Sequence, residues 1–162
     1  MKEVVLQLAG IEPGSELGAV VAKRADIFEL TQETHDAALR PAEPGGLSHG
    51  FRAAIACRIA RLNRDAAFTE YFDEALDLAQ PTEVERRASD LGFAGSDERT
   101  RALIRHADLL AANPKNASGS DIEALVRAGV SEPDIVRLSE LVAFLSYEIR
   151  VVAGLRLMRR SA

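Results

Sequence analysis

Apolar side chains recur along the chain at intervals of three and four residues, the spacing that places them on one face of an α-helix. Proline and glycine gather in short clusters between these stretches, and no stretch alternates with the two-residue period of a β-strand. The pattern therefore predicts an all-α fold of six or seven helices. Their expected ranges are 15–40, 48–63, 66–80, 82–90, 96–113, 120–128 and 131 onward.

Capping residues stand at several of these boundaries. Ser15, Ser48 and Asp65 each precede an apolar run, where a side-chain oxygen accepts from the free backbone N–H groups of a first turn. Ser120 and Glu123 have the spacing of a capping box, in which a hydroxyl and a carboxylate satisfy such groups reciprocally. We expect helices to begin at these four places.

The last predicted helix is apolar on nearly all sides. Its apolar residues include Ile135, Leu138, Leu141, Phe144, Leu145, Ile149 and Val152. A helix of this kind either runs through the centre of a bundle or is covered by another subunit, and the pattern leaves both open.

Composition limits the setting in which the protein works. A chain of 162 residues can bury enough surface for one core, so a single domain over 1–162 is expected. One cysteine excludes an intrachain disulfide and an all-cysteine metal site, and it fits a reducing, cytoplasmic setting. A formal charge of −5 argues against a nucleic-acid partner. The most apolar stretch, 141–147, is far shorter than the roughly 20 residues that cross a membrane, so no membrane partner is expected.

Few residues suggest chemistry by themselves. Cys57 lies in mid-helix, where a free cysteine typically behaves as a small buried hydrophobe. His35, His49 and His106 have no metal-ligand spacing and are expected at the surface or in caps. No phosphate-binding loop and no serine-hydrolase elbow is present. Motifs alone therefore assign no catalytic, cofactor or metal residue.

The run from Leu47 to Asn63 resembles the signature helix of the carboxymuconolactone decarboxylase and alkylhydroperoxidase (AhpD-like) superfamily. Segments 97–104, 121–131 and 135–150 are similar to the second half of its peroxidase-related members, so the resemblance covers roughly two thirds of the chain. It implies an AhpD-like helical bundle that assembles into a dimer, trimer or hexamer.

Peroxidase members of this superfamily carry a C-x-x-C pair after the signature helix, with a histidine and a glutamate as proton relay. The resemblance places the cysteines on Asp65 and Phe68, the histidine on Phe72 and the glutamate on Ala53. An aspartate cannot cycle through sulfenic acid, and phenylalanine offers neither a thiol nor a proton acceptor. Cys57 lies two helical turns before the vacated site and has no partner thiol. We therefore predict that the protein is not a cysteine-dependent peroxidase.

Three functions remain as hypotheses. The first is a non-catalytic structural or regulatory subunit of a homo-oligomer, with a catalytically intact relative as a candidate partner. The second is a cysteine-independent, decarboxylase-like enzyme that acts on a small anionic metabolite. The third is a binding protein for an apolar ligand, held beside aromatic side chains of the predicted helix over 66–80. Whether the protein is an enzyme stays open among them.

A candidate pocket follows from these hypotheses. Its residues are His49, Arg58, Asp65, Phe68, Tyr71 and Phe72. In the enzyme hypothesis the substrate carboxylate is bound by arginine side chains, because a guanidinium group recognises a carboxylate through two parallel hydrogen bonds. The candidates for that role are Arg52, Arg58 and Arg61, and those for the proton carrier are His49, Asp65 and Glu70.

Overall fold

Helices make up all the regular structure of residues 3–161, which are the residues that the computed structural model describes. This part of the chain contains nine α-helices, one short 3₁₀ helix and no strand, which confirms the all-α prediction. The elements are α1 (Val4–Ala9), α2 (Glu16–Ala22), α3 (Ala25–Leu39), α4 (His49–Leu62), α5 (Ala66–Leu78), α6 (Glu83–Ala88), α7 (Glu98–Ala112), η1 (Pro114–Asn116), α8 (Gly119–Arg127) and α9 (Glu132–Ser161).

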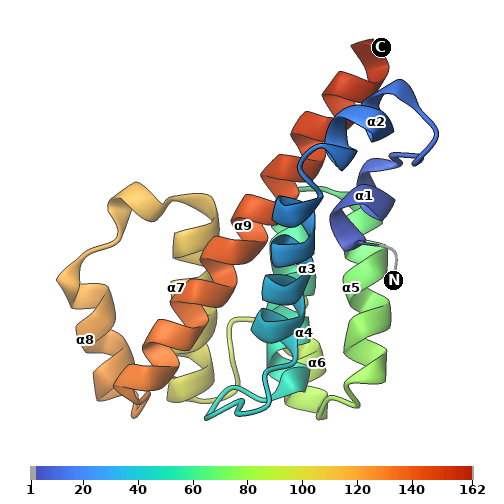
Figure 1. Ribbon diagram of the computed structural model, residues 1–162. Helices are drawn as coiled ribbons and strands as arrows, with labels where there is room; N and C mark the ends of the chain where they lie inside the picture. The colour runs from blue at the N-terminus through green and yellow to red at the C-terminus, as the bar shows by residue number, and fades with distance from the viewer. Residues whose placement is uncertain (1–2, 162) are drawn as a thin grey trace.

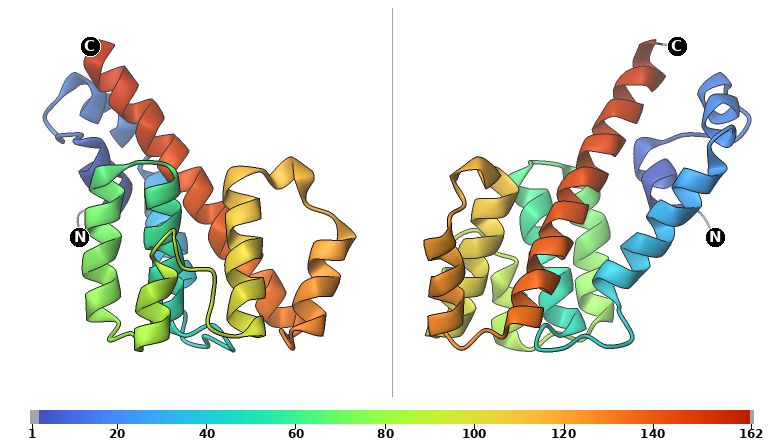
Figure 2. Two further views of the ribbon diagram at one scale, coloured as in Figure 1. Left: turned by 180° about the vertical axis from the view of Figure 1, so that it is seen from behind. Right: turned by 60° about the vertical axis from the view of Figure 1, so that its left-hand side comes forward.

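Helix α9 crosses the whole bundle. Its 30 residues contact α1, α3, α4, α7 and α8, and its C-terminal end extends beyond the other helices (Figure 1). Helices α7 and α8 lie at one end of the molecule and α5 at the other (Figure 2). Contact with these helices buries much of the apolar surface of α9, whereas Val136 and Tyr147 stay exposed. None of the helices in residues 3–161 has both the length and the hydropathy needed to cross a bilayer.

Helix α4, which contains the signature run, forms the centre of the core. Every residue from Gly50 to Ala60 is buried, and the helix packs against α3, α5, α6, α7 and α9. The Ser48 hydroxyl accepts from the Phe51 backbone N–H at 3.0 Å, as the capping prediction requires. A short turn then leads directly into α5, so the helix pair expected over 48–80 is confirmed.

The N-terminal part differs from the predicted helices in two places. The sequence pattern does not predict α1, because a six-residue segment is too short to show a helical period. This helix ends at Gly10, whose φ of 67° is readily adopted by glycine. The single helix expected over 15–40 is two helices, separated at Lys23 and Arg24, where neither glycine nor proline marks a break. These differences account for nine helices in the described residues instead of six or seven.

The capping box of α8 lies two residues before its predicted position. The backbone N–H and the hydroxyl of Ser118 both donate to Oδ2 of Asp121, each at 2.9 Å. Ser118 and Asp121 have the same three-residue spacing as Ser120 and Glu123, so two registers compete in this stretch. The predicted capping box of Ser120 and Glu123 is therefore wrong, because Ser118 and Asp121 form it instead.

Two residues of α5 test this description of the core. Phe72 is fully buried and Leu78 is 80% exposed. We expect Phe72→Ala to lower the free energy of unfolding by about 3–5 kcal/mol, because it leaves a cavity in the core. The matched change Leu78→Ala should alter it by no more than about 0.5 kcal/mol. Urea unfolding followed by circular dichroism measures both, and equal losses would contradict the packing described here.

Candidate functional site

The positions that the resemblance assigns to redox cysteines are part of the structural framework. Asp65 caps α5, with its Oδ1 accepting from the Phe68 backbone N–H at 3.1 Å. Its carboxylate also pairs with Arg156 of α9, whose Nη2 lies 3.3 Å from Oδ1. Phe68 and Phe72 are fully buried, with ring centroids 5.7 Å apart. These side chains therefore serve packing and capping.

The arginines proposed as ligands for a substrate carboxylate hold the protein's own groups instead. Arg58 is almost fully buried and pairs with both oxygens of Asp108, at 2.6 and 2.8 Å. It also donates to the last carbonyl of α6 and to carbonyls of the loop between α6 and α7. Arg52 donates to one backbone carbonyl of α3 and to two of the loop that leads into α4. Arg61 pairs with a carboxylate of α5. Arg58 and Asp65 do not converge, since each has a different partner.

A chain of three titratable side chains lies inside the bundle, where α3, α5 and α9 meet. The carboxylate Oε1 of Glu148 lies 2.9 Å from Nδ1 of His35, and Nε2 of His35 lies 2.9 Å from the Tyr71 hydroxyl. His35 and Glu148 are buried, with 1% and 0% of their surface exposed. The expectation that His35 lies at the surface is therefore wrong. We call Glu148, His35 and Tyr71 the buried relay.

The order of donors in the buried relay follows from the chemistry of its groups. An ionised carboxylate can only accept, so Glu148 requires a proton on Nδ1 of His35. In the neutral imidazole, Nε2 then carries the lone pair and accepts from the Tyr71 hydroxyl. Burial, together with the negative charge of Glu148, raises the pKa of Tyr71 to about 12. The phenol therefore remains protonated at neutral pH and available as the donor.

The buried relay opens into a cavity of about 250 Å³ between α3, α4 and α5. Small side chains of α4 and α5 leave this space, and the exposed lining residues are Arg40, His49 and Leu78. The lining residues are His35, Leu39, Arg40, His49, Ala53, Tyr71, Ala75, Leu78 and Ala79. We call this cavity the relay pocket. Of the predicted pocket residues it contains His49 and Tyr71, whereas Arg58, Asp65, Phe68 and Phe72 are not among its lining residues.

The relay pocket adjoins the positions at which peroxidase members carry their proton relay. Ala53, where the resemblance places the glutamate, lines the pocket. Phe72, where it places the histidine, stacks on His35 with ring centroids 6.1 Å apart and planes at 14°. An imidazole supplied by α3 thus lies next to the position at which the resemblance places the relay histidine.

Cys57 is held in a setting that suppresses its reactivity. The side chain is fully buried, and its thiol donates to Oδ1 of Asp73 at 3.0 Å. Burial and this hydrogen bond raise the pKa of Cys57 to about 12, so almost no thiolate forms at neutral pH. Among residues 3–161, no three side chains of His, Cys, Asp or Glu are grouped so that they could hold a metal ion.

Comparisons with known proteins identify the fold. No protein-family model matches the chain, and no curated protein matches it. An uncharacterised peroxidase-related protein from Ralstonia eutropha, described as an alkylhydroperoxidase AhpD core, superposes with a TM-score of 0.69 at 21% identity, over 83% of this chain and 71% of that one. An uncharacterised peroxidase-related protein from a Silicibacter species has a TM-score of 0.69 at 16% identity, over 81% and 69%. The chain therefore has the AhpD-like fold that the resemblance implies.

These features predict that the protein does not consume peroxide through a thiol. With hydrogen peroxide and dithiothreitol, we expect peroxide to disappear at the rate of the protein-free control, because Cys57 is buried, mostly protonated and without a second thiol. A coupled peroxide assay on the wild-type protein and Cys57→Ser measures this rate. Turnover that requires Cys57, or that survives its replacement, would contradict the assignment of this site.

Proposed function

We propose that the relay pocket carries out proton transfer on a small anionic molecule, without a redox cysteine. The observation that supports this is the continuous hydrogen-bonded chain from a fully buried carboxylate to a phenol at the pocket wall. A charged carboxylate buried among apolar side chains is costly, and such groups concentrate at functional sites. This proposal develops the cysteine-independent, decarboxylase-like hypothesis at a different set of residues.

The proposed step moves two protons in one direction. The Tyr71 oxygen accepts a proton from the substrate while the phenolic proton passes to Nε2 of His35, so the phenol is restored and an imidazolium forms. Glu148 stabilises that imidazolium through its contact with Nδ1. The reverse transfer delivers a proton to the substrate carbanion, as an isomerisation or a decarboxylation requires.

Arg40 is the lining residue that favours an anion. Arg40 lines the relay pocket, and although its Nη2 lies 3.2 Å from Asp36, this ion pair is exposed and therefore weak. His49 also lines it and is held by the Pro41 carbonyl at 2.9 Å. The remaining lining side chains are mainly leucine and alanine. A small carboxylate with an apolar body fits this distribution.

Proton exchange tests the proposal. In D₂O, the protein should replace a C–H proton of at least one small 2-oxo or unsaturated carboxylate by deuterium, which proton NMR detects. Tyr71→Phe should slow this exchange by about 10²–10⁴-fold, because it removes the hydroxyl that contacts the substrate.

Tyr147→Phe is the matched control, since this hydroxyl lies on α9 near Thr31 and is not a lining residue of the relay pocket. It should exchange like the wild-type protein. Exchange that persists in Tyr71→Phe would contradict the proposal, and so would the absence of exchange for all small 2-oxo and unsaturated carboxylates tested.

A second candidate is the non-catalytic structural or regulatory subunit of a homo-oligomer. It is supported by the packing and capping roles of the positions that the resemblance assigns to redox groups, and by large apolar side chains that are exposed in the described monomer. On α2, α3 and α9 these include Val20, Ile27, Leu30, Tyr147 and Met158. Burial of such side chains between copies of the chain is a common reason for oligomer formation.

Native mass spectrometry tests the oligomer. We expect a dimer, trimer or hexamer that Leu30→Lys weakens, because Leu30 is 57% exposed and a buried lysine would lose its hydration. Glu33→Gln changes an exposed residue of the same helix and should leave the assembly intact. A monomer at micromolar concentration would contradict this second candidate.

A further inference from the structure

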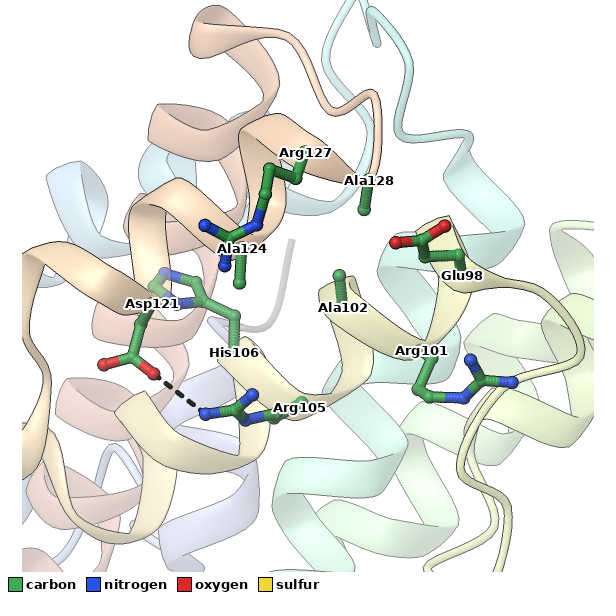
Figure 3. A pocket seen from close by; sticks show the side chains of 9 residues that line it. All are labelled: Glu98, Arg101, Ala102, Arg105, His106, Asp121, Ala124, Arg127 and Ala128. Atoms are coloured by element: carbon green, nitrogen blue, oxygen red, sulfur yellow. Dashed lines mark hydrogen bonds and ion pairs between the residues drawn. The ribbon is translucent and has the colours of Figure 1, made fainter.

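A second pocket, of about 270 Å³, lies between α7 and α8 on the other side of the molecule from α5. Figure 3 shows its lining side chains, with the guanidinium groups of Arg105 and Arg127 on either side of the His106 imidazole. Arg101 and Glu98 lie at the opposite end from Asp121. We call this cavity the α7–α8 pocket.

His106 is the unusual member of this set. The sequence places it among surface or cap residues, but only 4% of it is exposed, and its Nδ1 has no hydrogen-bond partner among the described residues. A buried polar atom without a partner is uncommon, because the lost hydration is not replaced. Since the imidazole lines the pocket, a bound molecule can supply the missing partner.

The hydrogen bonds around His106 determine what that partner must be. The Ser139 hydroxyl donates its proton to the Ile135 carbonyl at 2.8 Å, so its oxygen accepts from Nε2 of His106 at 3.3 Å. Nδ1 of the neutral imidazole therefore carries a lone pair. Burial lowers the pKa of His106, which keeps the ring neutral near pH 7. The free atom is thus an acceptor and requires a donor from the ligand.

We propose that the α7–α8 pocket binds a small oxyanion that retains an O–H proton, for which hydrogen phosphate is the simplest probe. Its charged oxygens lie between Arg105 and Arg127, and its O–H donates to Nδ1 of His106. Nothing in this proposal depends on the relay pocket.

The acidic side chains of the pocket favour a protonated ligand. Both oxygens of Asp121 are already used, Oδ1 by Arg105 at 3.2 Å and Oδ2 by Ser118 at 2.9 Å. These hydrogen bonds lower the pKa of Asp121, so it stays ionised. Glu98 is exposed at the far end. The two carboxylates and the lone pair on Nδ1 repel a fully deprotonated oxyanion, because all of them are negative or electron-rich. The arginines still attract the charge of an oxyanion that keeps one proton.

Isothermal titration calorimetry at pH 7 and constant ionic strength tests the pocket with inorganic phosphate and with sulfate. Sulfate has the same shape but no O–H, so it should bind at least about tenfold more weakly. Arg127→Gln should weaken phosphate binding by about fivefold or more, because it removes one charged donor. Arg86→Gln, on the exposed surface of α6, should not change it.

Nitrogen NMR of the wild-type protein provides a readout that does not depend on a variant. Phosphate should shift the Nδ1 resonance of His106, and sulfate should not. Equal affinity for the two anions, or no binding of millimolar phosphate, would overturn the proposal. Methyl phosphate, a monoester that has no other hydroxyl group and is mostly the dianion near pH 7, tests the O–H requirement separately. Tighter binding of this ester than of inorganic phosphate would also overturn the proposal.

Discussion

The carboxylate of Glu148 lies on α9 with none of its surface exposed, and the side chains around it must compensate its charge. An ionised carboxylate in a protein interior costs several kcal/mol unless it is paired. One of its oxygens contacts His35, and the other has no hydrogen-bond partner among the described residues. His35 is therefore the group on which this buried charge depends, and Tyr71 completes the sequence of hydrogen bonds toward the relay pocket. Two hydrogen bonds that share His35 thereby connect α3, α5 and α9, which are distant in the sequence.

The same structure has an AhpD-like fold, with Asp65 and Phe68 at the positions that the resemblance assigns to redox cysteines. Helix α4 is buried along nearly its whole length, so its alanines, isoleucines and arginines determine packing with five neighbouring helices. Arg58 secures the loop between α6 and α7, and the pair formed by Asp65 and Arg156 connects the start of α5 to α9. These roles are architectural and do not require cysteine. The residues that stabilise this fold are therefore different from those that thiol chemistry requires, and a fold by itself does not determine a function.

The sequence predicts well those features that depend on neighbouring residues. Ser48 and Asp65 cap the helices that follow them, because a capping side chain reaches only the next turn. Contacts between distant segments are not encoded in this way, and the partners of Arg58 and Asp65 were therefore not predictable.

The buried relay did leave a local signal. His35 lies four residues after Thr31 and four before Leu39, and all three are buried. Glu148 similarly interrupts a buried stripe between Leu145 and Val152. A titratable residue within an apolar helical stripe indicates a buried polar network, although it does not identify the partner.

The central claim is that Glu148, His35 and Tyr71 form one ordered chain of donors and acceptors. Nitrogen-15 NMR of the His35 imidazole tests it most directly, because a protonated ring nitrogen and one with a free lone pair have clearly different chemical shifts. At pH 7 we expect a proton on Nδ1 and a lone pair on Nε2, and we expect Glu148→Gln to change this distribution. A proton on Nε2 with a lone pair on Nδ1, or rapid averaging of the kind seen for exposed histidines, would contradict the account.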